Sequence, residues 1–318
     1  MAAEEDPQSV PASAPRRDPR PDSDSGMARA GASETRESDL PGLAEAIAEV
    51  TADQPDAPLP SPEPDSGPSD PIISFKNVSI SFDGRPVLKD VSFSVHRGQT
   101  LCILGRSGVG KSVSLRMLMG FLQPDSGSIH VEGREIVGLS ETEMMAIRRR
   151  VTMVFQNGAL FDSLSVRENV CYPLREHGGL DEDQIQQIVD RLIGLVGADD
   201  VVDALPASLS TGRKRAVAMA RALAAQPEVV LYDEPTTMVD PIIARRLGNL
   251  IQRLKHQLGF TSIVVTHDMR FAERLADTVL FLDQGEAKFF GPLQEFVASP
   301  NEHVQQFLTL DAYVLPST

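Results

Sequence analysis

The chain has 318 residues, a formal net charge of −15 at pH 7 and only two cysteines, Cys102 and Cys171. Two cysteines provide neither a disulfide framework nor a metal-ligand pattern. No apolar run approaches the roughly 18 residues expected of a transmembrane helix. We therefore expect the chain to lie in a reducing compartment and not to span a membrane.

The first 70 residues differ in composition from the rest of the chain. They contain no aromatic residue, 12 of the 23 prolines, and 16 acidic against 5 basic side chains. Such a segment cannot bury enough apolar surface to offset the entropy of ordering. We predict a disordered, acidic, proline-rich tail over residues 1–70 and one folded unit over residues 71–318. The folded unit holds 29 acidic and 25 basic side chains, which gives no reason to expect a nucleic-acid partner.

The tail fits neither a transit peptide, for which it is too acidic, nor a signal peptide, for which it lacks an apolar core. Within it, Leu43, Ile47 and Val50 have helical spacing, so a helix here would have one apolar face. This segment is either a transient helix in a linker or a short docking motif for a partner groove.

Short β-favouring runs lie on both sides of a turn signal, Asp83-Gly84, near the start of the folded unit. The runs are residues 72–75, 78–82, 87–88 and 91–95. The pattern predicts short strands joined by turns. 

A phosphate-binding pattern follows the apolar, strand-like run 101–104. Residues 105–112, Gly-Arg-Ser-Gly-Val-Gly-Lys-Ser, fit G-x-x-x-x-G-K-[ST]. Its glycines let successive backbone N–H groups turn around an anion, which the start of the next helix also attracts. We expect Lys111 to reach the β- and γ-phosphates and the Ser112 hydroxyl to bind Mg²⁺. The predicted nucleotide-binding residues here are Gly105, Arg106, Ser107, Gly108, Val109, Gly110, Lys111, Ser112 and Val113.

A pair of carboxylates ends another apolar run. Residues 229–232 are typical of a buried parallel strand, and Asp233 and Glu234 follow directly. Ligands of open α/β sheets bind beyond the carboxyl ends of the strands. Asp233 is therefore placed to hold Mg²⁺, and Glu234 to orient or deprotonate a water that attacks the γ-phosphate. The strand-like run 262–266 delivers His267 in the same way.

A third motif lies between these two, at residues 209–213, Leu-Ser-Thr-Gly-Arg. The three motifs in this order resemble the ABC-type ATPases. The resemblance implies an α/β fold, with a P-loop ATPase domain that carries a small antiparallel β-subdomain and a helical subdomain. It also implies ATP and Mg²⁺ as cofactors and ATP hydrolysis coupled to transport as the activity.

The resemblance assigns roles to further residues. Phe82 lies where the family places an aromatic ring that stacks on adenine, the alternative being a plain core phenylalanine. Gln156 matches a glutamine that contacts Mg²⁺ and the attacking water, and His267 matches a histidine that contacts the γ-phosphate. Ser210 and Gly212 match signature residues that donate to a γ-phosphate on the opposite subunit. Because the chain has one P-loop and one signature, two complete sites need two copies of the chain or a similar partner, and a homodimer is the economical arrangement.

The expected catalytic residues are Lys111, Gln156, Glu234 and His267, and the expected metal ligands are Ser112, Gln156 and Asp233. Four positions depart from the family pattern. Thr211 replaces the first signature glycine, Arg213 a glutamine and Ala216 an arginine, while Met238 stands where a small residue is usual. These changes bear on rate and dimer geometry and leave the hydrolytic set in place.

A closer resemblance covers most of residues 71–318 and peaks over residues 155–177. The Gly-Ala-Leu-Phe step at 158–161 and the Tyr-Pro-Leu-Arg-Glu-His step at 172–177 resemble the Mce/Mla-type ATPases, which power phospholipid or other lipid movement across the envelope of double-membraned bacteria. The resemblance implies an integral-membrane permease, bound by the surface after Gln156, and an MCE-domain lipid-binding protein. It also implies a peripheral position on the cytoplasmic face of the inner membrane.

Two other interpretations stay open beside lipid transport. One is an ABC ATPase that drives another substrate class, such as a polar solute or a drug. The other is a division-type ABC ATPase that acts on a membrane partner and moves no cargo.

Overall fold

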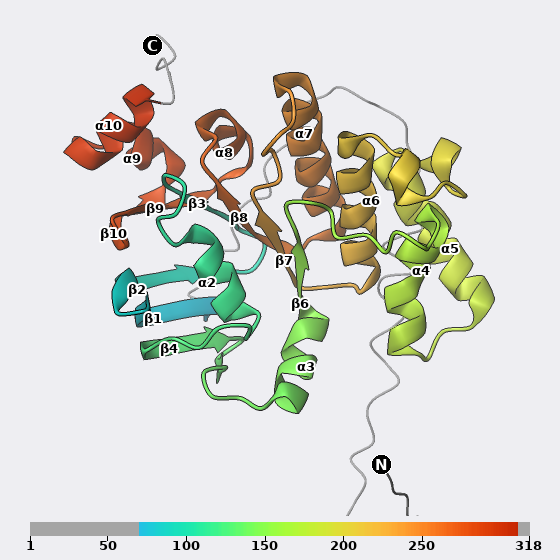
Figure 1. Ribbon diagram of the computed structural model, residues 1–318, viewed down its shortest axis with the longest axis horizontal. Helices are drawn as coiled ribbons and strands as arrows, with labels where there is room; N and C mark the ends of the chain where they lie inside the picture. The colour runs from blue at the N-terminus through green and yellow to red at the C-terminus, as the bar shows by residue number, and fades with distance from the viewer. Residues whose placement is uncertain (1–69, 311–318) are drawn as a thin grey trace, which may run out of the picture. The chain divides into compact units, whose positions relative to one another are not determined.

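The computed structural model describes residues 70–310. The expected tail, with its Leu43, Ile47 and Val50 segment, lies outside the described residues apart from Asp70. The described residues fall in one compact unit and contain a four-stranded and a six-stranded sheet (Figure 1).

The four-stranded sheet is antiparallel, in the order β2-β1-β4-β5. Its strands are β2 (Arg85–Val95), β1 (Ile73–Phe82), β4 (Ser126–Val131) and β5 (Arg134–Glu135). Asp83 and Gly84 both have positive φ, as a tight hairpin turn between β1 and β2 requires. The four short runs expected from the sequence form two long strands, because register shifts near Val78 and Ile80 let the pairing continue through irregular positions.

The six-stranded sheet has the order β10-β9-β3-β8-β7-β6. Its strands are β10 (Glu286–Pro292), β9 (Thr278–Asp283), β3 (Thr100–Leu104), β8 (Thr261–Thr266), β7 (Val229–Asp233) and β6 (Val151–Val154). All neighbours are parallel except β9 and β10. The carboxyl ends of β3, β7 and β8 therefore meet at one edge of the sheet, which is where such sheets bind ligands.

A group of three helices forms the helical subdomain that the sequence predicts. α4 (Val166–His177) and α5 (Glu182–Val196) pack on α6 (Thr211–Ala224), and in Figure 1 they lie on the side of α6 away from the antiparallel sheet. Ser165 with Glu168 and Asp181 with Gln184 form capping boxes that fix the starts of α4 and α5.

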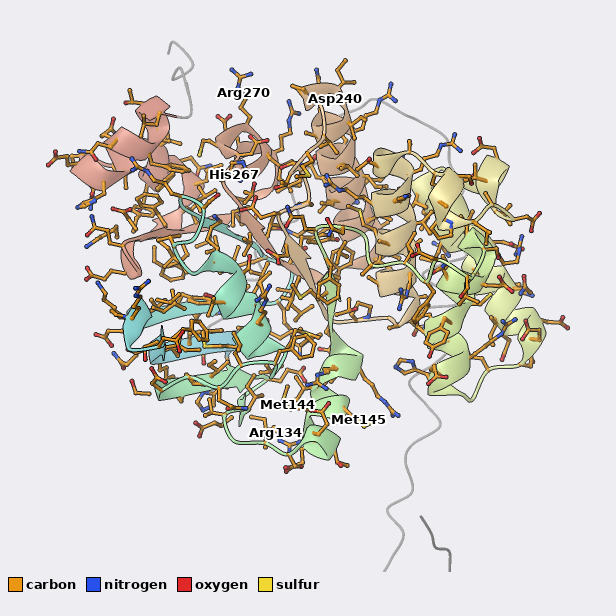
Figure 2. The ribbon with its side chains drawn as sticks, in the orientation of Figure 1. Arg134, Met144, Met145, Asp240, His267 and Arg270 are labelled. Carbon is orange, nitrogen blue, oxygen red and sulfur yellow. The ribbon has the colours of Figure 1, made fainter. Side chains whose placement is uncertain are left out.

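The remaining helices surround the two sheets. They are α2 (Lys111–Leu118), α3 (Glu141–Arg150), α7 (Pro241–Leu258), α8 (Met269–Leu275), α9 (Leu293–Val297) and α10 (Glu302–Leu310), with the short 3₁₀ turns η1 (Asp199–Val201) and η2 (Pro206–Ser208). On α3, Met144 is buried whereas its neighbour Met145 is exposed (Figure 2). None of the described helices is long and apolar enough to cross a membrane.

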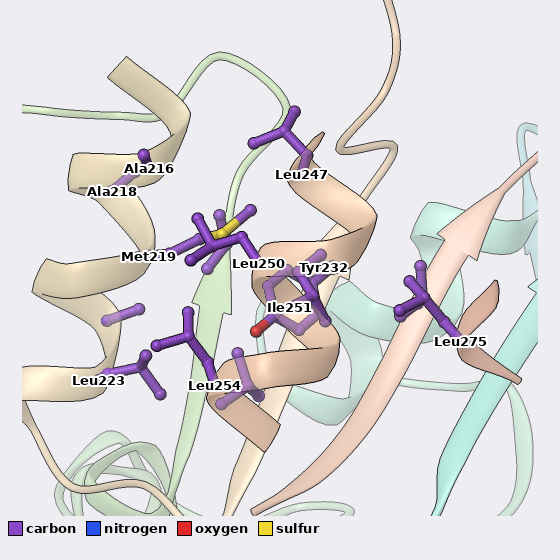
Figure 3. Close-up of a cluster of buried hydrophobic side chains, with 14 of the residues drawn as sticks. Ala216, Ala218, Met219, Leu223, Tyr232, Leu247, Leu250, Ile251, Leu254 and Leu275 are labelled. Atoms are coloured by element: carbon purple, nitrogen blue, oxygen red, sulfur yellow. The ribbon is translucent and has the colours of Figure 1, made fainter. Parts of the chain in front are cut away.

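The buried side chains form two clusters on opposite faces of the six-stranded sheet. β7 contributes to both, because successive side chains of a strand point to opposite faces. Val229 and Leu231 join the cluster that includes the antiparallel sheet and α2, and Val230 and Tyr232 join the other. Figure 3 shows part of this second cluster, with Met219, Leu223, Leu250, Ile251 and Leu254 around Tyr232. Cys102, in β3, is likewise buried in that cluster as a free thiol.

Candidate active site

The phosphate-binding pattern forms the connection from β3 to α2. Gly105 and Gly110 have φ values of 150° and 107°, which side chains rarely permit. A Cβ at Gly105 would lie 2.4 Å from the carbonyl oxygen of Leu282, and one at Gly110 would lie 2.5 Å from Cδ2 of Leu88. Only glycine allows the loop to approach β9 and β2 this closely.

The other residues of the pattern divide by exposure. Arg106, Ser107 and Gly108 are exposed at the crest of the loop. Val109 and Val113 are partly buried and pack against the cluster that contains the antiparallel sheet. The two valines therefore anchor the loop, while the crest residues face solvent.

Lys111 is the first residue of α2 and is only 5% exposed. Its Nζ donates to the carbonyl oxygens of Gly105 and Arg106, at 2.8 and 3.1 Å. The same nitrogen lies 3.2 Å from Oε1 of Glu234. The ammonium group thus joins the loop to the carboxylate beyond β7.

Ser112 and Asp233 are in direct contact, since the Ser112 hydroxyl donates to Oδ1 of Asp233 at 2.6 Å. Burial raises the pKa of Asp233, the Ser112 hydrogen bond opposes that rise, and the charge of Glu234 adds to it. A hydroxyl and a carboxylate are oxygen ligands of the kind Mg²⁺ uses when phosphates and water complete its shell. No group of three or more His, Cys, Asp or Glu side chains within residues 70–310 could hold a metal ion. The pair therefore fits a metal that is shared with a nucleotide.

Glu234 follows β7 directly and has a φ of 47°. Its N–H donates to the carbonyl oxygen of Val265 in β8, at 2.9 Å. Its Oε2 lies 2.7 Å from Nδ1 of His267 and accepts a 3.2 Å hydrogen bond from the hydroxyl of Thr237. With Lys111, three side chains surround this carboxylate.

His267 directly follows the carboxyl end of β8. Figure 2 shows it just before α8, on the same side of the molecule as Asp240, which caps α7. The loops after β3, β7 and β8 therefore bring Lys111, Glu234 and His267 together.

Gln156 and Phe82 lie apart from these contacts. Gln156 is two residues beyond the end of β6, and Val154 pairs with Tyr232, so Gln156 is at the same sheet edge as the two carboxylates. Phe82 ends β1 and is 42% exposed, unlike a core phenylalanine such as Phe75.

The signature residues lie at the start of α6. Ser210 caps the helix by accepting from the N–H of Arg213 at 3.4 Å, and Thr211 is its exposed first residue. A Cβ at Gly212 would lie 3.1 Å from Cγ2 of Ile243 in α7. Within the described part of the chain, no hydrogen bond or ion pair joins Ser210 or Gly212 to the phosphate-binding loop.

Two of the other departures from the expected pattern lie in α6, and the third lies in the loop before α7. Arg213 pairs with Asp200 at 2.8 Å, and Ala216 is buried. Met238, in the loop that leads to α7, is 91% exposed.

Arg215 and Thr237 make contacts that the sequence does not signal. Arg215 is 4% exposed on α6, and its guanidinium donates to the backbone oxygen of Pro235 at 2.5 Å and to that of Thr237. An arginine on a helix is usually exposed, so only the three-dimensional structure reveals a buried one.

An aromatic pair marks the surface after Gln156. Phe161 and Tyr172 are 38% and 39% exposed, and their ring centroids are 4.7 Å apart. Arg221 lies 4.3 Å from the centroid of Phe161 and donates to the carbonyl oxygen of Ala159 at 2.6 Å. Leu160, by contrast, packs against the second core cluster.

The chain is similar in sequence to a known protein family and to several known proteins. Residues 88–237 match the protein family described as ABC transporter. The methionine import ATP-binding protein MetN of Brucella abortus is 40% identical over 238 residues, which cover 75% of this chain and 64% of that protein. The chain thus spans less than two thirds of the length of that relative.

Two further similarities concern a plant protein and a solved structure. Protein TRIGALACTOSYLDIACYLGLYCEROL 3, chloroplastic, of Arabidopsis thaliana is 39% identical over 258 residues, covering 76% of this chain and 74% of that protein. The ATP-binding cassette MJ0796, solved as a dimer in a post-hydrolysis state with ADP and Pi, has a TM-score of 0.64 and 28% identity, covering 70% of this chain and 98% of that one. The Brucella name points to methionine import and does not support the expected Mce/Mla-type relationship.

Proposed function

Because the chain belongs to the family of ABC transporter ATP-binding proteins, we propose that it hydrolyses ATP as the motor subunit of a membrane transport complex. The observation that carries this proposal is the convergence of Lys111, Glu234 and His267, next to the Ser112–Asp233 pair, at one edge of a parallel sheet. Each of these groups has a role in phosphoryl transfer to water.

The residues divide the work as follows. Lys111 and the backbone of the glycine loop bind the phosphates. Ser112 and Asp233, with Gln156, would hold Mg²⁺, which would neutralise charge on the transferred phosphate. Glu234 orients or deprotonates the attacking water, and His267, which contacts the Glu234 carboxylate, would contact the γ-phosphate.

The active unit in this proposal is a homodimer. Ser210 and Gly212 begin α6, where a helix start attracts an anion, yet the described contacts do not connect them to the loop of their own chain. A second copy supplies them. The dimeric form of the ADP-bound MJ0796 cassette supports this arrangement. We place the dimer on the cytoplasmic face of the membrane, where it binds an integral-membrane permease.

The permease-binding surface in this proposal is the aromatic patch, which we define as Phe161, Tyr172 and Arg221. Its two large aromatic rings are partly exposed and in contact with each other, and Arg221 packs against the ring of Phe161. A partly exposed apolar patch of fixed shape is suited to rigid contact with a partner.

For the cargo, a polar solute of the methionine type is the first candidate, since it is named in the Brucella relative. A lipid is the second candidate. It is favoured by the 158–161 and 172–177 steps and by the Arabidopsis relative, which is named for a glycolipid and of which the chain covers 74%. Lipid cargo would imply an MCE-domain partner, and methionine cargo a different substrate-binding partner.

Purification with native membrane partners tests the proposal. The co-purified proteins are identified, and the complex is reconstituted in vesicles. In one assay labelled methionine is added outside the vesicles, and in the other labelled phospholipid is placed in one leaflet. We expect ATP-dependent movement of one label and none with Lys111→Ala. Movement of phospholipid alone selects the second candidate. An intact permease complex that hydrolyses ATP and moves neither label rejects both cargo candidates and leaves another cargo or the division-type alternative.

A further inference from the structure

We propose that Arg215 and Thr237 form a positioning relay that fixes the carboxylate of Glu234, an inference that rests on the catalytic role proposed above for Glu234. The relay consists of the Arg215 guanidinium, the backbone of the loop after β7 and the Thr237 hydroxyl. Neither residue touches the reacting atoms, so both act through Glu234.

The loop that carries Glu234 has an unfavourable backbone that needs external support. Glu234 and Met238 have φ values of 47° and 61°, in the left-handed region that non-glycine residues avoid. Strained residues of this kind persist only where their surroundings hold them, and they cluster at functional sites. On one side, Val265 of β8 accepts from the N–H of Glu234 at 2.9 Å.

Arg215 provides the support on the other side. Its guanidinium reaches two carbonyl oxygens, those of Pro235 and Thr237, and thereby brackets the residue between them. The planar fork of an arginine suits two fixed acceptors in a way that the single ammonium group of lysine does not. Arg215 thus clamps the loop from α6.

The burial of Arg215 indicates that its contact with the loop after β7 does more than fill space. The side chain is 4% exposed, no carboxylate within residues 70–310 pairs with it, and its Nε lacks a hydrogen-bond partner there. Burying a charge is costly unless it is paired and hydrogen-bonded. An apolar side chain would fill this position of α6 without that cost, so the two hydrogen bonds to the loop are what the arginine adds.

Thr237 completes the relay, because each of its polar groups is engaged. Its carbonyl oxygen accepts from Arg215, its N–H donates to the carbonyl oxygen of Glu234 at 3.2 Å, and its hydroxyl donates to Oε2 of Glu234 at 3.2 Å. A shift of the guanidinium therefore moves the hydroxyl that orients the carboxylate. Since Arg215 follows Gly212 by three residues on α6, the relay also joins the signature helix to the catalytic carboxylate of the same chain.

The test uses the full chain with Thr237→Val, Thr237→Ser and Arg215→Lys. ATP affinity is measured by equilibrium binding of a fluorescent ATP analogue, and kcat by phosphate release. We expect Thr237→Val and Arg215→Lys to lower kcat about tenfold, as loss of a hydrogen bond to a charged group predicts, and to change affinity by less than about twofold. Thr237→Ser, which keeps the hydroxyl, should have a kcat close to that of the wild-type protein.

Arg253→Lys controls for the loss of an arginine-to-carbonyl hydrogen bond away from the site, because Arg253, exposed on α7, donates to the carbonyl oxygen of Leu195 in α5 at 2.7 Å. It should leave kcat unchanged. Wild-type kcat in Thr237→Val, or an equal loss in Thr237→Ser, would overturn the relay. If Arg215→Lys loses its circular dichroism signal, the threonine pair still decides the question.

Glu234→Gln, measured alongside, separates the two levels of the proposal. An inactive Glu234→Gln with a fully active Thr237→Val rejects the relay and leaves the catalytic assignment standing. Normal hydrolysis by Glu234→Gln rejects that assignment, and the relay with it.

Discussion

The hydroxyl of Ser112 donates a 2.6 Å hydrogen bond to the carboxylate of Asp233, and this contact ties the start of α2 to the end of β7. It joins two residues that are 121 positions apart in the sequence. The proposed metal ligands are thus positioned by the fold. Their closeness has a cost, because Asp233 is a buried carboxylate beside a second one, Glu234.

That cost predicts the effect of Asp233→Asn. Since burial raises the pKa of Asp233, the folded protein holds its proton more tightly than the unfolded chain does. Relative to the variant, the wild-type protein is therefore most stable below about pH 4, the ordinary pKa of an aspartate. It loses that stability as the pH rises through the raised pKa of Asp233. At neutral pH, without nucleotide, Asp233→Asn should be the more stable protein, and it should have lost Mg²⁺-dependent hydrolysis.

Urea unfolding of both proteins between about pH 4 and pH 7 checks this prediction, since that range spans the titration of a carboxyl with a raised pKa. The stability advantage of the asparagine variant should shrink towards the acid end. An advantage that does not vary with pH would contradict the assigned burial cost.

Glu234→Gln and Lys111→Ala should fail in different ways. Glutamine keeps the shape of Glu234 but cannot take a proton, so turnover should fall roughly 10²–10⁴-fold while ATP still binds. Lys111→Ala removes a buried cation from the phosphate loop and should weaken ATP binding itself. Equilibrium binding and single-turnover hydrolysis distinguish the two, and near-normal turnover in Glu234→Gln would move the role of base to another residue.

Thr211→Gly should have little effect. Thr211 is the exposed first residue of α6 and is not among the residues with positive φ, so the signature does not require the freedom of glycine at this position. We expect a loss of roughly 0.5 kcal/mol in the free energy of unfolding, from the poorer helix propensity of glycine, with an unchanged ATPase rate. A large rate change would show that the side chain acts at the dimer interface.

Phe161→Ser should separate hydrolysis from transport. Phe161 is exposed in the aromatic patch, so its loss should spare the fold and basal ATP hydrolysis but abolish permease binding and cargo movement together. Phe290→Ser, at a similarly exposed ring on β10, is the control and should behave as wild type. Leu160→Ser is a poorer probe, because Leu160 packs against the core and its loss should lower stability by about 1–2 kcal/mol. Normal transport by Phe161→Ser would reject the patch as the coupling surface.

Tyr232→Phe should stabilise the protein. Tyr232 is fully buried among apolar side chains (Figure 3), and its hydroxyl lacks a hydrogen-bond partner within residues 70–310. Removing an unsatisfied hydroxyl should raise the free energy of unfolding by about 1 kcal/mol. Thermal unfolding measures the effect, and a lower melting temperature would mean that a water molecule satisfies the hydroxyl.

The sequence placed Lys111, Glu234 and His267 at one edge of the sheet because each follows an apolar run, and parallel strands end at a common edge. The three residues come from separate loops and lie together in the structure, while their roles in hydrolysis stay a prediction. The family resemblance rested on the same motifs, and the α/β architecture with its antiparallel and helical subdomains is confirmed.

Features that depend on distant contacts could not be predicted in this way. The contact of Arg215 with the loop after β7 spans 20 residues and joins two elements. The four short runs of the first sheet became two strands because pairing with a neighbour carried them through irregular positions.

Because side chains of β7 enter both cores, the strand cannot gain or lose one residue without disrupting them. Asp233 has the same parity as Val229 and Leu231, so it points to the face that carries α2, whereas Val230 and Tyr232 point to the other. Inserting or deleting one residue in this strand would exchange the two faces, placing each set of apolar side chains in the core shaped for the other and turning the carboxylate away from Ser112. An in-frame insertion or deletion of one codon in β7 would therefore remove stability and chemistry in one event, whereas exposed loops tolerate such changes far better.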